Sequence, residues 1–247
     1  DSVLTTKDDD NSNSGDTSFP STVAQILALT WIENDVEETT TSGTIYVGNN
    51  EIGFTSHDIQ RIIQRYAVAT IYYSTTRDGT TEWSNSDLWL TPLDECLWNG
   101  IECEETVPVL GNNETTTTTD PTFNGVTKVL LNDNNLIGTI PLEIGLLQYV
   151  EAIDFAGPKD NTVRLLDEEI ILVGSIPTAI GVLTDLSSID ISFQGLTGTI
   201  PTHLQSLSSL LYLDLEYNAF TGWLPTELGS ITTLEYVDLA GLEFMSG

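Results

Sequence analysis

Positively charged residues are scarce in this sequence. Its 247 residues contain 7 Lys and Arg against 37 Asp and Glu, which gives a formal net charge of −30. Nucleic acids and anionic membrane surfaces both require positive charge, so the composition argues against these two classes of partner. It favours cationic partners, divalent ions or simple solubility in a saline or extracellular medium. No Lys or Arg follows Arg164, whereas 11 Asp and Glu do.

Long hydrophobic runs and catalytic motifs are also absent. No apolar run reaches the roughly 18 residues of a membrane span. The sequence has no G-x-S-x-G, P-loop or H-E-x-x-H motif, so we expect neither enzymatic activity nor a cofactor. Two cysteines and two distant histidines do not supply the four ligands of a zinc site, and no metal site is expected.

What the sequence does contain is a repeat. In segment 186–239 the same sequence pattern occurs more than twice, and Gly198 and Gly222 occupy the same place in it, 24 residues apart. Segments 126–149 and 150–185 have the same form, although the second is interrupted in its middle. A period of about 20–29 residues with the pattern L-x-x-L-x-L-x-x-N-x-L is typical of a leucine-rich repeat.

Each repeat predicts one coil of a solenoid. Leu210, Leu213 and Leu215 point into the coil, while the residues between them alternate outwards as in a short strand. Asn134 and Asn218 can bond the backbone of the turn that leaves the strand. A Gly-x-Ile/Leu-Pro turn then starts the return path. One coil cannot bury its own apolar edge, so the coils stack and their parallel strands line a concave surface.

These repeats resemble the plant-type leucine-rich repeat of receptor-kinase ectodomains and polygalacturonase-inhibiting proteins. The motif G-x-I/L-P carries the resemblance and occurs at residues 138–141, 174–177, 198–201 and 222–225. Trp89 and the run C-x-W-x-G-I-x-C from Cys96 to Cys103 are similar to the N-terminal cap of that family. Segment 63–76 (IQRYAVATIYYSTT) is similar to such proteins from diatoms and related algae.

The resemblance implies an α/β repeat solenoid in an extracellular protein, with short parallel strands on the concave face and a small helical cap region before them. It also implies a disulfide between Cys96 and Cys103, since cysteines of extracellular chains commonly pair.

The cap region is expected to contain two helices. The first runs from Ser21 to about Asn34, and its apolar face is formed by Val23, Ile26, Leu27 and Trp31. The second runs from about Thr55 to about Ser74, and its apolar stripe is formed by Ile59, Ile62, Ile63, Tyr66, Thr70 and Tyr73. Arg61 and Arg65 lie one helical turn apart on it, and we expect them to pair with nearby carboxylates.

An addition between the cap and the repeats departs from the family pattern. The segments VPVL (107–110) and GVTKVL (125–130) can pair as strands around a loop. This loop contains Asn113 in the only N-x-[ST] sequon of the sequence, so we expect a glycan there.

A second departure lengthens one coil. Gly138 and Gly174 lie 36 residues apart, and the extra residues fall near 158–169. Insertions in repeat proteins map to loops on one face, which is often the binding face. A tolerated surface loop explains the insertion equally well.

Alignment of the strands places outward-facing residues in columns. One column contains Leu130, Asp154, Asp190, Asp214 and Asp238; another contains Lys128, Ala152, Ser188, Tyr212 and Tyr236. Carboxylates that bond only backbone and water would explain the first column without a ligand. Alternatively, the charges recruit a cation beside aromatic side chains of the kind enriched at binding hot spots. We select as candidate ligand-binding residues Asp190, Phe193, Tyr212, Asp214, Glu216, Tyr217, Tyr236 and Asp238.

The two ends of the sequence resemble those of a segment cut from a longer protein. The chain begins with Asp1 rather than Met, and it stops at Gly247 inside a repeat, without a polar capping repeat. An uncapped stack exposes apolar surface. We therefore expect a processed ectodomain with more chain, or a docked partner, beyond Gly247.

Three parts are predicted: an acidic flexible linker over 1–20, a helical cap region with a disulfide over 21–105, and about five repeats over 106–247, the last incomplete. The favoured function is a secreted or cell-surface recognition module that binds a protein, peptide or glycan partner, either basic or polyhydroxylated, through its concave face. The alternative is an acidic cell-wall or matrix protein that binds Ca²⁺ or mineral and self-assembles.

Overall fold

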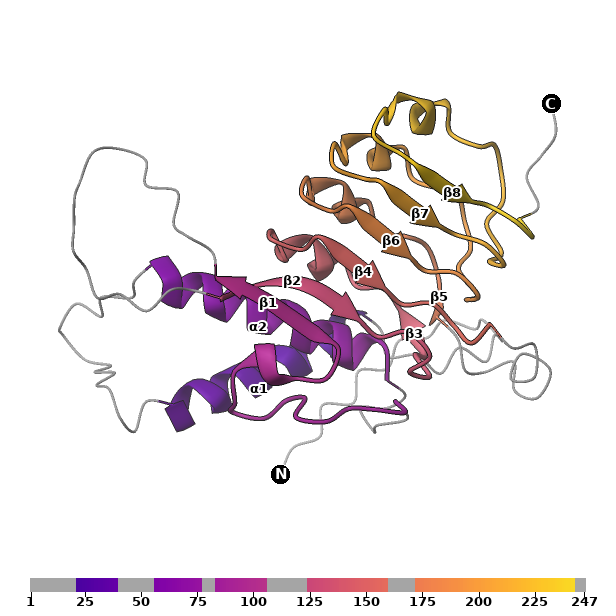
Figure 1. The fold of residues 1–247 in the computed structure, drawn as a ribbon. Helices are drawn as coiled ribbons and strands as arrows, with labels where there is room; N and C mark the ends of the chain where they lie inside the picture. Colours follow the sequence, from indigo (N-terminus) through magenta and orange to yellow (C-terminus); the bar gives the residue numbers. More distant parts are fainter. Residues whose placement is uncertain (1–20, 40–55, 77–82, 106–123, 160–171, 243–247) are drawn as a thin grey trace, which may run out of the picture.

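A six-stranded sheet with the strand order β1-β2-β4-β6-β7-β8 dominates the molecule. The structure, a computed structural model, describes residues 21–39, 56–76, 83–105, 124–159 and 172–242. β1 (Ile101–Glu105) is antiparallel to β2 (Asn124–Leu130), and every later pairing is parallel. The later strands are β4 (Ala152–Asp154), β6 (Ser188–Asp190), β7 (Tyr212–Asp214) and β8 (Tyr236–Asp238). Because successive strands are neighbours (Figure 1), the predicted repeat solenoid is confirmed.

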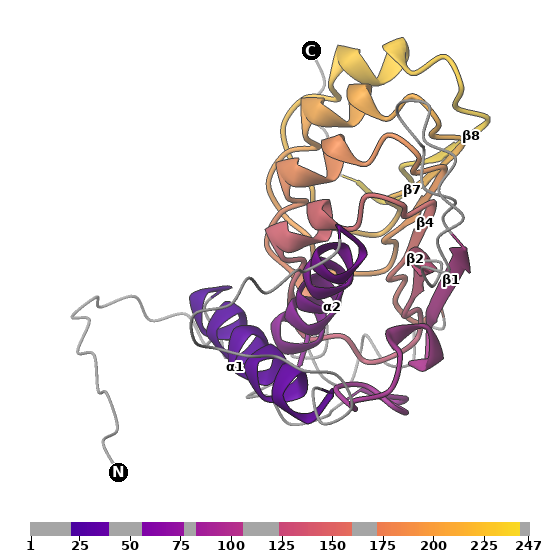
Figure 2. The same ribbon diagram turned by 90° about the vertical axis from the view of Figure 1, so that its left-hand side faces the viewer.

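The return path of each coil passes through a short 3-10 helix. These helices are η3 (Leu142–Leu146), η4 (Thr178–Val182), η5 (Thr202–Ser206) and η6 (Thr226–Ser230). Each follows a proline with φ between −61° and −76°, which is the conformation that the proline ring imposes. Figure 2 shows them stacked on the side away from the strands. The Gly-x-Ile/Leu-Pro motif therefore starts the return path, as predicted.

The glycine of this motif makes the turn. Gly138, Gly174, Gly198 and Gly222 all have φ between 78° and 117°, a region that other residues enter at a cost. Gly138 also begins β3 (Gly138–Thr139), which pairs in parallel with β5 (Leu172–Val173) in a second sheet. Most of the expected insertion, namely residues 160–169, lies outside the described residues.

The coil interior holds the repeated leucines. Leu210, Leu213 and Leu215 are completely buried, as the sequence pattern predicts. Full burial of one such side chain stabilises a fold by about 1.5–3 kcal/mol. The same positions of neighbouring coils form one continuous apolar core that reaches the cap.

The asparagine position joins neighbouring coils. The Oδ1 atom of Asn218 accepts a hydrogen bond from the backbone N–H of Leu196 at 3.0 Å, and its Nδ2 donates to the carbonyl of Ile191 at 2.8 Å. Both partners belong to the preceding coil. Gln194 holds the equivalent position there, with bonds to Leu172 and Phe155. The predicted turn role is confirmed at Asn218, whose Nδ2 also donates to Leu215 of its own coil at 3.1 Å.

Two helices, α1 (Ser21–Thr39) and α2 (Ser56–Ser74), form the cap over the first coil. The predicted face of α1 is wrong in part: Ala24 and Ala28 are fully buried, whereas Ile26 is 58% exposed. Small residues at this contact let α1 pack closely on α2. None of the described helices has the length and apolar character needed to cross a membrane.

The predicted stripe of α2 is also wrong in part. Besides Thr70, the helix buries a set that the stripe did not contain, namely Ala67, Val68, Ile71 and Tyr72. The stripe residues Ile62, Ile63, Tyr66 and Tyr73 are half-buried, and the side chain of Ile59 lies outside the described residues. The reason is that α2 is covered on several sides, because it contacts α1, η3 and β2 at once.

The cap is organised around a buried ion pair. Arg65 is 4% exposed, and its Nη1 lies 2.6 Å from Oε2 of Glu95, which is 1% exposed. The Arg65 guanidinium also lies 5.0 Å from the ring centre of Trp31 and 5.3 Å from that of Trp98. Arg61, by contrast, is half-exposed. Carboxylate partners are confirmed, but the expectation that they are local in sequence is wrong, because Asp94 and Glu95 lie far along the chain, and for Arg65 the pair is a core contact.

The disulfide implied by the resemblance is present between Cys96 and Cys103, with Cα atoms 5.5 Å apart. It joins η2 (Glu95–Leu97) to β1. β1, rather than the predicted segment 107–110, is the antiparallel partner of β2. That segment and Asn113 lie outside the described residues.

Candidate binding surface

The strand register produces the predicted columns. Asp154, Asp190, Asp214 and Asp238 are direct partners in successive parallel pairs. Tyr212 pairs with Tyr236 two positions earlier along the same strands. Since alternate strand residues share a face, both columns project from the outer face of the sheet, here called the strand face. The eight candidate residues therefore come from three adjacent coils and are brought together; we call them the strand-face patch.

Two aromatic stacks border this patch. The rings of Tyr212 and Tyr236 have centroids 4.6 Å apart and are inclined by only 4°. The rings of Phe193 and Tyr217 have centroids 4.9 Å apart and are inclined by 26°. Along one coil the outward positions run from the first stack, through the aspartate column, to the second stack. The carboxylates consequently lie between two aromatic stacks.

The second stack depends on an unusual backbone. Phe193 and Tyr217 have φ values of 55° and 51°, in the left-handed region that costs a non-glycine residue about 1–3 kcal/mol. In the next coil the same position is Gly241, with φ 71°, where a Cβ atom would lie 2.8 Å from the Tyr217 ring. The equivalence of Gly241 with Tyr217 can be read from the aligned sequence, but its close approach to the ring cannot.

One oxygen of each column aspartate serves the fold. The Oδ1 atoms of Asp154, Asp190, Asp214 and Asp238 each accept the backbone N–H two residues further on, at 2.9–3.1 Å. Such Asx-type contacts stabilise the turn that leaves a strand. The interpretation without a ligand therefore accounts for one oxygen in every aspartate.

The remaining oxygens meet hydroxyl donors in the C-terminal coils. The Tyr212 hydroxyl donates to Oδ2 of Asp214 at 3.2 Å, and the Tyr236 hydroxyl donates to Oδ2 of Asp238 at 3.1 Å. These bonds hold both rings upright beside the carboxylates. In the preceding coil, Ser192 Oγ donates to Oδ1 of Asp190 at 2.6 Å, the oxygen that also accepts the Ser192 backbone N–H. The sequence-based selection missed Ser192, and its position two residues after Asp190 is the only clue to it.

Negative charge accumulates on this surface. Burial raises the pKa of Asp214 above its ordinary value, and the charges of Asp190 and Asp238 raise it further, although the Glu216 N–H and the Tyr212 hydroxyl oppose the shift. The pKa of Glu216 is raised by burial and by the neighbouring aspartates. Burial also raises the pKa of the Tyr212 hydroxyl far above 10, with a further contribution from Asp214. A cation placed here would relieve these unfavourable interactions.

The N-terminal end of the strand face differs. Lys128 continues the tyrosine column on β2, and its Nζ lies 2.6 Å from a Glu102 carboxylate oxygen on β1. At the Asp154 end, burial raises the pKa of Asp154 and Glu216, and the charge of the exposed Lys159 partly opposes this rise. Among the described residues, Asp190, Asp214 and Asp238 take part in none of the ion pairs.

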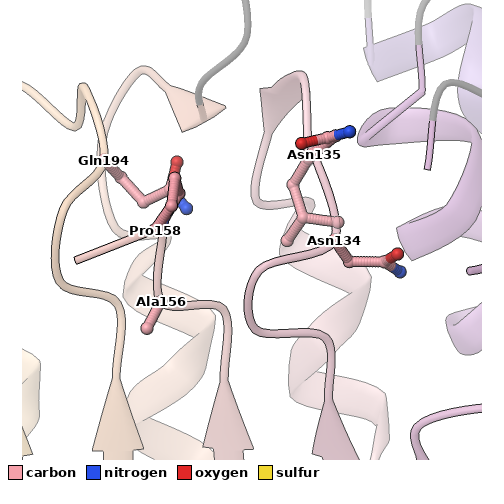
Figure 3. A pocket seen from close by; sticks show the side chains of 7 residues that line it. Asn134, Asn135, Ala156, Pro158 and Gln194 are labelled. Carbon is pink, nitrogen blue, oxygen red and sulfur yellow. The ribbon is translucent and has the colours of Figure 1, made fainter. Parts of the chain in front are cut away.

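A small hollow lies where the chain leaves the strands. Asn134, Asn135, Ala156, Pro158 and Gln194 surround it (Figure 3). Its volume of about 10 Å³ is room for roughly one water molecule, so it is too small for an organic ligand. Within the described ranges, no group of three or more His, Cys, Asp and Glu residues is arranged to hold a metal ion.

Comparison with known proteins agrees with this architecture. Residues 209–231 match the Leucine Rich Repeat family. A search of the curated proteins finds no significant match. The BIR3–SERK2 complex from Arabidopsis thaliana is similar at a TM-score of 0.53 and 23% identity, over 73% of this chain and 82% of that one. The ectodomain of the Arabidopsis receptor kinase SOBIR1 gives 0.53 and 22%, over 74% and 82%.

A plant ice-binding protein is similar at a TM-score of 0.54 and 27% identity, over 72% of this chain and 47% of that one. This chain thus spans about half the length of that protein. The similarity to algal proteins stays a prediction. The repeat match, the shared fold and the repeated Gly-x-Ile/Leu-Pro turns together show that the chain has the leucine-rich repeat fold, similar to that of plant ectodomains.

Proposed function

We propose that this chain is an extracellular recognition module that binds a protein or peptide partner through the strand-face patch. The observation that carries the proposal is the gathering of two aromatic stacks and a line of carboxylates on one face of three adjacent coils. Tyrosine offers a large, rigid contact surface with little entropy to lose on binding. Tyr217 and Tyr236 are 45% and 43% exposed, so their rings are accessible to a partner.

The extracellular setting is part of the same proposal. A structural disulfide such as Cys96–Cys103 persists in oxidising compartments and is uncommon in the cytosol. One similar structure is by its name a receptor-kinase ectodomain, and another is by its name a complex of two proteins, so this fold occurs in both settings. For the alternative, a Ca²⁺-binding matrix protein, we find no supporting cluster of metal-binding side chains among the described residues.

The test is a selection with a random 12-residue peptide library displayed on phage, with the full 247-residue chain immobilised. Selected peptides are then assayed against Tyr212→Ala and Asp214→Asn, variants that remove one ring or one charge of the patch. Each variant is expected to weaken binding by at least about tenfold, or about 1.4 kcal/mol. The matched control is Trp223→Ala, because Trp223 is a 57% exposed aromatic residue of the same coil outside the strands. Selected peptides that bind all four proteins equally would refute the proposal.

A further inference from the structure

The hydrogen-bond donors beside Asp190, Asp214 and Asp238 already bond these carboxylates. Ser192 Oγ donates to Asp190, the Tyr212 hydroxyl to Asp214 and the Tyr236 hydroxyl to Asp238. The backbone N–H groups two residues after each aspartate donate to the same carboxylates. The strip between the stacks therefore offers a partner acceptor oxygens and aromatic rings. A complementary partner must supply the donors.

The negative charge of the strand-face patch favours donors that are positively charged. Its carboxylates are those of Asp190, Asp214, Glu216 and Asp238, and no Lys or Arg occurs in the sequence after Arg164. Lys159 acts on Glu216 from the N-terminal side and is exposed. Opposite charges across an interface favour association and suppress wrong partners. A neutral, hydroxyl-rich glycan would leave the carboxylates uncompensated.

The cap of the same protein also combines aromatic rings with a carboxylate, and there an arginine occupies the space between them. Arg65 lies against the rings of Trp31 and Trp98 while its guanidinium bonds Glu95. Arginine suits this environment because its planar guanidinium stacks on aromatic faces and still donates five hydrogen bonds in its plane. Lysine offers a compact, strongly hydrated charge that cannot do both.

From these observations we infer that the partner of the strand-face patch is a peptide segment that places arginine side chains between the two aromatic stacks. The guanidinium groups lie against the exposed rings of Tyr217 and Tyr236 and donate to the partly exposed carboxylates of Asp190, Glu216 and Asp238, while the buried Asp214 adds its negative charge. This inference rests on the proposed recognition function and names the chemistry of the partner.

The experiment uses three fluorescein-labelled peptides and the full chain. One peptide carries arginine at alternate positions with glycine between them, the second carries lysine instead, and the third carries citrulline, which is planar but neutral. Fluorescence anisotropy at 0.15 M salt is expected to show the arginine peptide binding at least tenfold more tightly than the citrulline peptide and about threefold more tightly than the lysine peptide. Equal binding of the arginine and citrulline peptides would overturn the inference.

A chain with a net charge of −30 attracts any cationic peptide, so the site needs a charge-matched control. Asp190→Asn with Asp214→Asn removes two charges from the patch while keeping an oxygen for each backbone N–H. Asp185→Asn with Glu227→Gln removes two charges outside the strands. Binding of the arginine peptide is expected to fall at least tenfold in the first pair and less than twofold in the second. An equal loss in both pairs would mean non-specific attraction and would refute the inference.

The library selection separates this inference from the function on which it rests. Patch-dependent peptides enriched in arginine support both. Patch-dependent peptides without arginine leave the recognition function standing and remove the arginine partner. If no selected peptide depends on Tyr212, both proposals fall.

Discussion

The cap and the strand face combine the same kinds of side chain with opposite outcomes. In the cap, Glu95 and the tryptophan rings enclose Arg65, and the charges are neutralised inside the protein. On the strand face, Asp214 is 1% exposed beside stacked tyrosines, and no described cation is within ion-pair distance of it. In the cap the chain itself supplies the cation, whereas on the strand face we propose that a partner supplies it.

Removal of the cap cation is the largest predicted effect. Arg65→Met leaves the buried Glu95 without its charge partner, and breaking a buried ion pair from one side costs about 3–5 kcal/mol of unfolding free energy. Urea unfolding followed by tryptophan fluorescence measures the change, because Trp31 and Trp98 lie beside the substituted residue.

The control for this variant is Arg61→Met. Arg61 is half-exposed and lies 3.8 Å from the same carboxylate group, so its loss should cost less than about 1 kcal/mol. Similar losses for the two arginines would contradict the contrast between a core contact and a surface contact.

Removal of the disulfide should affect the cap and spare the patch. Replacing Cys96 and Cys103 with serine opens a short loop, and chain-entropy arguments give a loss of about 2–3 kcal/mol. Binding of the arginine peptide, measured well below the new unfolding temperature, should stay within about twofold of wild type. A larger loss of binding would show that the two regions are coupled.

The repeats could be predicted from sequence because each coil repeats its neighbour. A 24-residue spacing sets the strand register, so the columns of Tyr212 and Asp214 follow from the alignment alone. The second use of each aspartate, as acceptor of the N–H two residues on, follows from the same local pattern. Local and periodic contacts are readable from a sequence.

Non-periodic contacts of the cap could not be predicted. Arg65 pairs with Glu95, which lies 30 residues away, and no repeat or helical spacing relates the two. Sequence reasoning therefore predicted local partners for an arginine whose main partner is distant. The stripe expected on α2 failed for the same reason, since several elements cover that helix at once. In the patch, the bond that holds the Tyr212 ring to Asp214 depends on rotamers that the alignment does not specify.

The stability of the folded chain should depend on pH because of the buried carboxylates of the strand face. Burial raises the pKa of Asp154 and Asp214 in the folded state, so the folded chain binds these protons more tightly than the unfolded chain does. Their contribution to stability is present at low pH and is lost as the pH rises through the raised pKa values. Asp154→Asn with Asp214→Asn should therefore raise the midpoint temperature at pH 7 by roughly a few °C.

The same double variant should flatten the dependence of that temperature on pH above the ordinary carboxyl pKa of about 4, because the raised pKa values of Asp154 and Asp214 lie there. Calorimetry across this range measures both effects. A wild-type chain that loses stability relative to the variant on acidification would reverse the predicted sign.

The smallest predicted effect distinguishes the ring of Tyr212 from its hydroxyl. Tyr212→Phe keeps the stack on Tyr236 and deletes the donor to Oδ2 of Asp214, so the oxygen becomes available to an arriving guanidinium. The lost hydrogen bond should cost about 0.5–1.5 kcal/mol of stability. The arginine peptide should nevertheless bind about two- to threefold more tightly, in contrast to the tenfold loss expected for Tyr212→Ala. If Tyr212→Phe weakens binding as much as the alanine variant does, the hydroxyl itself contacts the partner and does not compete with it for Asp214.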